Sequence, residues 1–210
     1  SAGTLDPENM FRSVAEMRRP LPYVAMHMRG DPTNMQSEEN TTYIIQNDNH
    51  QHQQLGDFGS TVATVVASEL SQRAKLANAS GLEPWRLWSD PGIGFAKTHE
   101  GCWDLLGNLG DVRRGLGRSG AGCLARAPMV LGASRKGFLG AVTGRLNPAD
   151  RDAATAAVCV AGVLEGADVV RVHDVAAVVD ALKVADAVRK ARQPDREDEF
   201  NFNRGRVVGR

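Results

Sequence analysis

The chain has 210 residues, of which 42% are hydrophobic and 24% charged, with 25 basic and 25 acidic side chains. This balance excludes the basic excess that draws proteins to nucleic acid or to anionic membranes, so any anion must be bound by local geometry. The longest apolar run, Ala156 to Leu164, is far shorter than the roughly 20 residues of a membrane span. We expect one globular domain with no nucleic-acid or membrane partner.

The cysteines, Cys102, Cys123 and Cys159, are odd in number and widely spaced, without a CxxC pair. This pattern argues against a disulfide framework and against a zinc site, and it fits a reducing compartment.

The first half of the chain alternates helical and extended patterns. Asp6 and Pro7 are typical of an N-cap and a first helical position, so a helix is predicted there. The apolar segment 23–28 lies between a proline and a glycine and predicts a buried strand, and residues 56–80 predict a helix. The polar stretch 46–54 between them is interpreted as a surface loop.

The second half repeats this alternation. Residues 85–89 and 129–133 are short apolar segments that end in turn residues and predict two strands. The alanine-rich segment 148–164 predicts a helix, 167–173 a strand and 176–191 a last helix. The four strand-then-helix units indicate an α/β protein with a parallel sheet.

A (β/α)8 barrel has eight such units in about 250 residues, so the chain is expected to form the C-terminal half of a TIM barrel. We assign residues 1–192 to this domain and 193–210 to a disordered tail. The glycine-rich stretch 115–122 is interpreted as a flexible loop. Its GxGxxG spacing does not predict a nucleotide site, because no strand precedes it.

Three polar groups follow the predicted strands, where ligands sit in parallel α/β folds. Asp90 begins DPGIGFAK, and its carboxylate could accept two parallel hydrogen bonds, or it could merely cap a turn. Ser134, Arg135 and Lys136 follow Gly132 in LGASRKGF. Two cations there could hold a carbonyl or a phosphate, although a solvated basic turn is the commoner case.

Arg171 and His173 in ADVVRVH should share one face of the strand, with Val170 and Val172 on the other. Two donors on one face at a strand end suit a polyanion, while a structural salt bridge is the competing interpretation of the arginine. His27, alone in an apolar segment, is interpreted as a core histidine or as one that supports a ligand-binding residue, and not as a ligand itself.

The segments MHMRGDP, DPGIGFAK, LGASRKGFLG, DRDAAT and ADVVRVHD occur in the order and spacing of dihydropteroate synthases. From about Gly3 to Arg189 the chain resembles this pterin-binding family, and the plant enzymes in particular. The resemblance implies a transferase of folate biosynthesis with a (β/α)8 barrel, which condenses dihydropterin pyrophosphate with p-aminobenzoate to dihydropteroate.

The resemblance also implies roles for the matching residues. Asp90 and Lys136 would bind the edge and the carbonyl of the pterin, in a slot lined by Met26, Phe95 and Gly132. Arg171 and His173 would bind the pyrophosphate, and Ser134, Arg135 and the stem of Lys136 would border the p-aminobenzoate site. The catalytic set is thus Lys136, Arg171 and His173.

No protein metal ligand is assigned in this chain. The resemblance implies Mg²⁺, held through an asparagine loop of the family that precedes the matching region. It further implies a homodimer or a longer bifunctional chain with a pterin pyrophosphokinase, and a mitochondrial location if the protein is plant-like, otherwise a cytoplasmic one.

Two other interpretations stay open. The chain could be a non-catalytic, truncated pterin-binding subunit or fragment that keeps Asp90, Lys136 and Arg171. A cobalamin-linked folate methyltransferase shares the pterin barrel and ranks last, because its members are not expected to carry this SRKGF and RVH pair.

Overall fold

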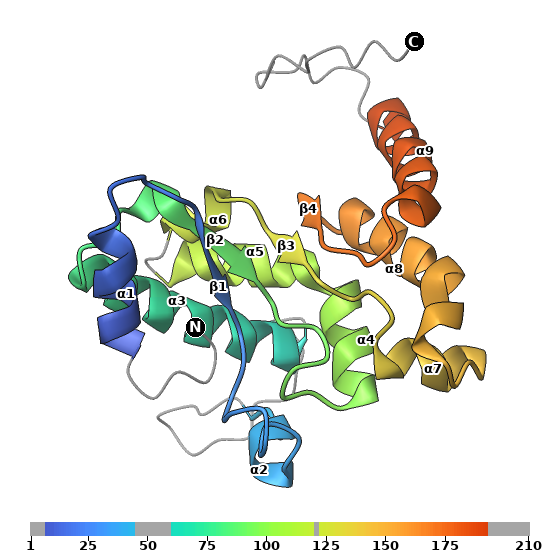
Figure 1. Ribbon diagram of the computed structural model, residues 1–210, viewed down its shortest axis with the longest axis horizontal. Helices are drawn as coiled ribbons and strands as arrows, with labels where there is room; N and C mark the ends of the chain where they lie inside the picture. Colours follow the sequence, from blue (N-terminus) through green and yellow to red (C-terminus); the bar gives the residue numbers. More distant parts are fainter. Residues whose placement is uncertain (1–6, 45–59, 120–121, 193–210) are drawn as a thin grey trace.

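The computed structural model describes residues 7–44, 60–119 and 122–192. In these parts helices and short strands alternate along the chain (Figure 1). The elements are α1 (Pro7–Ala15), β1 (Tyr23–Met26), α2 (Glu38–Thr41), α3 (Thr61–Ala79), the 3₁₀ turn η1 (Pro84–Arg86), β2 (Leu87–Asp90), α4 (His99–Gly107), α5 (Leu109–Arg118), α6 (Gly122–Arg126), β3 (Val130–Leu131), α7 (Gly137–Thr143), the 3₁₀ turn η2 (Pro148–Arg151), α8 (Asp152–Leu164), β4 (Val169–Val170) and α9 (Ala176–Arg192).

The four strands run parallel and side by side in the order of the sequence. β1 pairs with β2, with Met26 opposite Asp90, and β3 pairs with β4. The two pairs are joined at Ser89, which bridges to Met129 and whose amide donates to the carbonyl of Pro128 at 3.0 Å. Because all four strands are parallel, their carboxyl ends lie at one edge, as in a barrel of strand-helix units.

Helix α3 illustrates how the sequence fixes an element. The Ser60 side chain caps its start by accepting a hydrogen bond from the amide of Ala63. Alanine, valine and leucine then recur at helical spacing, and Gly81 follows the helix in a left-handed conformation. The buried residues of the helix include Ala63, Val66, Ala67, Leu70, Ala74 and Ala77.

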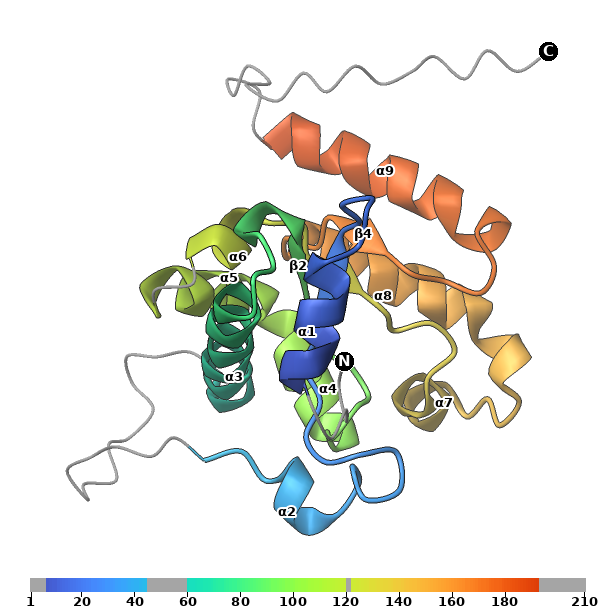
Figure 2. The ribbon, with the colours of Figure 1, turned by 60° about the vertical axis from the view of Figure 1, so that its left-hand side comes forward.

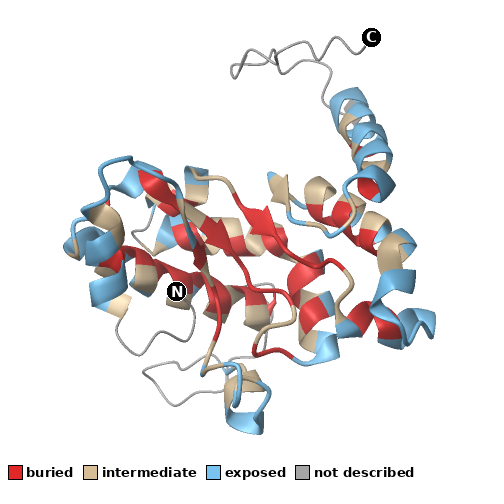
Figure 3. Cartoon of the chain, viewed as in Figure 1, coloured by how far each residue is buried: buried red, intermediate tan, exposed pale blue. Residues whose placement is uncertain are grey.

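The helices cover one face of the strands, with α3 and α5 side by side and α4 and α8 continuing the layer (Figures 1 and 2). Buried residues are concentrated in the strands and on the helix sides that face them (Figure 3). The opposite strand face is more open, since Val24 is 38% exposed and Met26 and Trp88 are half-buried. α9 packs on α8, and most of its remaining surface is exposed.

Arg73 of α3 lies against the edge of β1 that has no partner strand among the described residues. The amide of His27 donates to the carbonyl of Asp90 in β2, so the carbonyls of Met26 and Met28 point the other way. Arg73 donates to both of them, at 2.7 and 2.5 Å. Its guanidinium thereby occupies the unpaired carbonyls at the end of this strand.

The structure confirms the predicted order of four strand-helix units, with shorter strands. β2 begins at Leu87, because Trp85 belongs to η1 and is 64% exposed. β4 ends at Val170, so Arg171 and His173 follow the strand and do not lie in it. Both are exposed, while Val170 and Val172 pack on the core, as the predicted alternation requires.

The predicted flexible loop at 115–122 is wrong over its described residues. α5 continues to Arg118, and α6 begins at Gly122. Leu109, Val112 and Leu116 bury one side of α5. Gly115 lies where a side chain would not fit, since an added Cβ would be 2.6 Å from the Cβ of Ala67. The glycine permits close helix packing and does not break the helix.

The predictions for Asp6, for the loop at 46–54 and for the tail at 193–210 fall outside the described residues. Within the described ranges, no helix is both long and apolar enough to cross a membrane.

Candidate functional site

The predicted site residues lie at the carboxyl ends of the strands. Met26 and Asp90 end β1 and β2 as register partners, Gly132 and Ser134 follow β3, and Arg171 and His173 follow β4. The topology brings these residues to one edge of the sheet, although the sequence separates them by up to 147 positions, from Met26 to His173.

Asp90 is a buried carboxylate, with 5% of its surface exposed. One oxygen accepts a hydrogen bond from the amide of Gly92 at 2.8 Å, and no other hydrogen bond to this carboxylate is found among the described residues. Burial raises the pKa of Asp90, while the Gly92 amide and the charges of Lys136 and Arg171 act to lower it. A carboxylate with unused acceptor capacity in a buried position suits a ligand with paired N–H donors.

Lys136 crosses the loop that follows β2. Its ammonium donates to the carbonyl of Ile93 and lies 4.1 Å from the centre of the Phe95 ring. Gly94 makes the crossing possible, because a Cβ there would lie 2.7 Å from the Lys136 stem. Burial lowers the pKa of Lys136 to about 8, against the attraction of Asp90.

Arg171 and His173 follow β4 and lie with the other predicted site residues at the carboxyl ends of the strands. The guanidinium of Arg171 lies over Gly132, where an added Cβ would be 2.9 Å from Nη2. No ion pair of Arg171 is found within the described residues, so the structural salt bridge that competed with a binding role receives no support there. The guanidinium is exposed and available to an anion.

His173 is oriented by Ser134. The Oγ of Ser134 lies 2.8 Å from Nδ1 of the imidazole and accepts the backbone amide of His173 at 3.1 Å. Since the hydroxyl already accepts this amide, its own proton is free to be donated to Nδ1. In that arrangement Nε2 carries the single N–H proton of the ring and can donate it to a ligand.

Arg135 has a different position from its neighbours. Its guanidinium pairs with Asp152 at the start of α8 through two contacts of 2.7 Å each, and its amide donates to the hydroxyl of Thr155. Its φ of 59° is unusual for a residue with a side chain. These contacts tie the loop after β3 to α8, and they engage the guanidinium with a carboxylate of the same chain.

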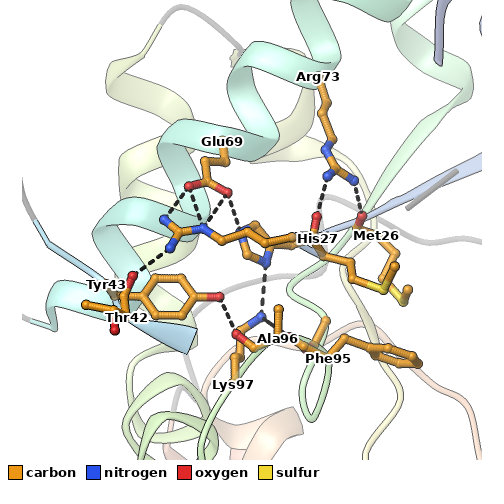
Figure 4. A network of polar contacts seen from close by, with 12 residues as sticks. Met26, His27, Thr42, Tyr43, Glu69, Arg73, Phe95, Ala96 and Lys97 are labelled. Atoms are coloured by element: carbon orange, nitrogen blue, oxygen red, sulfur yellow. Dashed lines mark hydrogen bonds and ion pairs between the residues drawn. The ribbon is translucent and has the colours of Figure 1, made fainter. Parts of the chain in front are cut away.

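A buried polar network lies behind the loop after β2 (Figure 4). His27 is fully buried and lies 2.9 Å from Glu69 of α3 through Nε2 and 3.0 Å from Lys97 through Nδ1. Burial and the nearby Lys97 lower the pKa of His27 to about 4, so the ring is neutral near pH 7. His27 is therefore the satisfied core histidine that its sequence context predicts.

Sequence reasoning missed four charged members of this network: Arg29, Glu69, Arg73 and Lys97. Burial acts to raise the pKa of Glu69, but hydrogen bonds from His27 and Arg29 lower it to about 2. Lys97 lies in the same DPGIGFAK segment as Asp90, and this closeness in the sequence was the signal that could have pointed to it. Its burial could not be inferred, because lysine is rarely fully buried unless its charge is paired.

A cavity of about 690 Å³ lies away from this edge, beside α3. Arg29, Glu69 and Arg73 line it, and none of the predicted site residues does. Its charged side chains already bind one another or backbone carbonyls. We therefore place the candidate site at the strand ends and not in this cavity.

The parallel strand-helix units carry a buried carboxylate, a lysine, an arginine and a histidine at the strand ends. This arrangement is an α/β enzyme-type site, and its groups suit a ligand that is both hydrogen-bonding and anionic. The family described as pterin binding enzyme matches residues 1–173. The chain belongs to this pterin-binding enzyme family.

Relatives in this family are named for folate synthesis. The chain is 43% identical over 193 residues to the mitochondrial folate synthesis bifunctional protein of Arabidopsis thaliana, covering 92% of this chain and 31% of that protein. It is 35% identical over 188 residues to the dihydropteroate synthase of Synechocystis, covering 90% and 54%. The chain thus spans about a third to about half of these two relatives.

The structure resembles that of the dihydropteroate synthase of Xanthomonas albilineans in complex with 7,8-dihydropteroate. The TM-score is 0.64 at 32% identity, and the match covers 85% of this chain and 52% of that one. The expected partial TIM barrel is confirmed.

Proposed function

We propose that the protein acts as a dihydropteroate synthase. In this reaction the amine of p-aminobenzoate forms a bond to the methylene carbon of dihydropterin pyrophosphate. The carbon–oxygen bond to pyrophosphate breaks, the amine loses a proton, and dihydropteroate is released. The observation that carries the proposal is the convergence of Asp90, Lys136 and Arg171 at the carboxyl ends of neighbouring parallel strands.

The pterin would bind between the loops after β2 and β3. The free acceptor capacity of Asp90 suits the paired N–H donors of the pterin's 2-amino edge, and Lys136 would donate to its carbonyl and ring nitrogen. Met26, Phe95 and Gly132 would line the slot. Gly132 fits this role, since it lets Arg171 approach the backbone of β3 closely.

The pyrophosphate would lie beyond the pterin, against Arg171 and His173. Arg171 is exposed and offers a guanidinium that suits a phosphate. His173 would donate through Nε2, with Ser134 holding its Nδ1. Loss of the leaving group ahead of amine attack would place its developing charge beside these donors, which is where electrostatic stabilisation acts.

The p-aminobenzoate would enter beside Ser134, Arg135 and the stem of Lys136. Because the guanidinium of Arg135 is paired with Asp152, only the flank of the Arg135 side chain would border the p-aminobenzoate while this ion pair is closed. The family resemblance alone supports this part of the proposal.

The described residues contain no cluster of side chains that could hold magnesium by itself. No group of three His, Cys, Asp or Glu side chains that could hold a metal ion is present in residues 7–44, 60–119 and 122–192. The ion stays an expectation of the family resemblance, and no step above depends on it.

The second candidate is a pterin-binding chain without turnover. It would need only the groups that face the pterin, Asp90 and Lys136. Pterin binding without product would select it.

Partner and location follow the relatives' names. A link to a pterin pyrophosphokinase is proposed because the Arabidopsis relative is a bifunctional protein, and a mitochondrial location because that protein is named mitochondrial. A homodimer remains a prediction, which light scattering on the purified chain would check.

The test is the incorporation of labelled p-aminobenzoate into dihydropteroate by the purified protein with dihydropterin pyrophosphate and magnesium. Lys136→Ala and Arg171→Ala should reduce the rate by at least about a hundredfold, with melting temperatures close to that of the parent. Parent-like rates in both variants would refute the site. Binding of dihydropterin pyrophosphate without product would favour the second candidate.

A further inference from the structure

The loop between β2 and α4 has an uncommon backbone conformation. Gly92, Gly94 and Ala96 all have positive φ, at 69°, 77° and 50°. Two of them are glycines, which adopt this conformation freely, but Ala96 is not. A residue with a side chain in the left-handed region costs about 1 kcal/mol or more and persists when surrounding contacts hold it. The surrounding contacts must therefore hold the backbone of Ala96 in this conformation.

Lys97 supplies three of these contacts. Lys97 is buried, with 3% of its surface exposed. Its ammonium donates to the carbonyls of Gly92 and Phe95 at 3.1 and 3.0 Å, and to Nδ1 of His27 at 3.0 Å. An ammonium has three hydrogens, and each has an acceptor here. Two contacts close the loop on itself, and the third joins it to the residue after β1 (Figure 4).

The third contact continues into the helix layer. His27 receives the lysine at Nδ1 and therefore carries its proton on Nε2, which donates to Glu69 of α3. The loop also lies directly on β1, because a Cβ at Gly92 would be 1.9 Å from the carbonyl oxygen of His27. Tyr43 donates to the carbonyl of Ala96 at 2.9 Å.

The other side of the same loop carries the groups of the candidate site. The amide of Gly92 bonds to the Asp90 carboxylate, and Lys136 reaches the carbonyl of Ile93 and the ring of Phe95. The loop thus lies between two lysines, Lys97 on the buried side and Lys136 on the ligand side. A shift of the loop would displace Asp90 relative to Phe95 and Lys136.

We infer that Lys97 is a positioning residue, which holds the loop of residues 91–96 in the shape that presents Asp90, Phe95 and Lys136 to the pterin. It acts through the loop and through His27 and has no contact with the ligand. The inference rests on the proposed function for the identity of the ligand, but the effect on the loop itself does not.

The test compares Lys97→Met, which keeps the length of the stem and removes the ammonium, with Lys75→Met on the exposed side of α3 as a matched control. In the ligand-free protein we expect the Phe95 amide, which bonds to the Gly92 carbonyl, to exchange its hydrogen at least about tenfold faster in Lys97→Met. Lys75→Met should exchange like the parent.

Turnover gives the second readout. Lys97→Met should raise the KM for dihydropterin pyrophosphate by about tenfold while the KM for p-aminobenzoate changes by less than about twofold. A general loss of stability would instead lower the apparent kcat, because less folded enzyme is present, and would leave both KM values near those of the parent. Ala96→Gly in the Lys97→Met background should recover part of the lost affinity, since glycine removes the strain at that position.

Parent-like exchange at Phe95 in Lys97→Met, or faster exchange with an unchanged KM for the pterin substrate, would overturn the inference. If Lys97→Met does not fold, Tyr43→Phe removes only the hydrogen bond to Ala96 and should give the same changes at about threefold. If the parent itself shows no turnover with pterin, the proposed function fails. The exchange rate at Phe95 then decides whether Lys97 holds the loop.

Discussion

Ser134 and His173, which follow adjacent strands, lie 2.8 Å apart from Oγ to Nδ1, and the same hydroxyl accepts the backbone amide of His173. One short side chain therefore fixes both the backbone and the ring of the histidine.

Replacing Ser134 by alanine should weaken the use of the pyrophosphate substrate by roughly fivefold in kcat/KM, the value of about one hydrogen bond. The physical reason is that His173 loses the partner that places its proton on Nε2. Nitrogen NMR of the imidazole would show a changed tautomer ratio. Ser80→Ala, which removes a hydroxyl bonded only within α3, is the control, and equal kinetics in the two variants would contradict the orienting role.

Arg135→Ala should act through Asp152. If the arginine serves only to tie the loop after β3 to α8, Asp152→Asn should cause the same loss in melting temperature and the same change in KM for p-aminobenzoate. The double variant should then add nothing further. A larger KM effect from Arg135→Ala than from Asp152→Asn would instead show that the arginine contacts the substrate.

Pterin affinity should fall as the pH rises through about 8, where burial places the pKa of Lys136. The charged lysine is the stronger donor, and its loss should weaken binding by roughly fivefold. Lys136→Arg, which stays charged, should remove this step. Lys97, whose pKa burial lowers to about 7, gives a separate and earlier change that the arginine variant should retain. Titration calorimetry across this pH range would separate the two, and a flat profile for the parent would contradict the prediction.

His27 should make the fold sensitive to mild acid. Its pKa is about 4 in the folded protein and 6.5 as the ordinary value, so the unfolded chain binds more protons between these limits. Stability therefore falls as the pH drops from 6.5 toward 4, by up to about 3 kcal/mol. Urea unfolding at several pH values would measure it.

His27→Gln should flatten that dependence, because glutamine has no titrating group. Glu69 titrates in a lower window, since its pKa of about 2 in the fold lies below its ordinary 4.5 and its contribution is lost as the pH falls between these values. An unchanged slope between pH 6.5 and 4 in His27→Gln would assign the acid sensitivity to other groups.

The sequence predicted the four strand-helix units because short apolar segments bounded by proline and glycine carry a strong local signal. It also placed Asp90, Lys136, Arg171 and His173 together, since parallel strands bring their carboxyl ends to one edge. This part of the site depends only on the order of elements.

The interior of the site could not be predicted in the same way. The burial of Lys97 depends on carbonyls at Gly92 and Phe95 and on a histidine 70 positions away. The glycines of α5 wrongly predicted a flexible loop, because Gly115 lacks a side chain to permit close packing against Ala67 and not to provide flexibility. Both errors come from contacts between distant segments, which local patterns do not encode.

Arg73 places a charge at the edge of β1 that pairs with no other strand of the described residues, on the carbonyls of Met26 and Met28. An exposed strand edge is a template on which strands of other molecules can add, and a charged side chain at the edge opposes this. Arg73 should therefore raise the protein concentration at which copies of the chain begin to associate through their sheets. Colloidal behaviour and the candidate site, to which Met26 belongs, are thus linked through the same short strand.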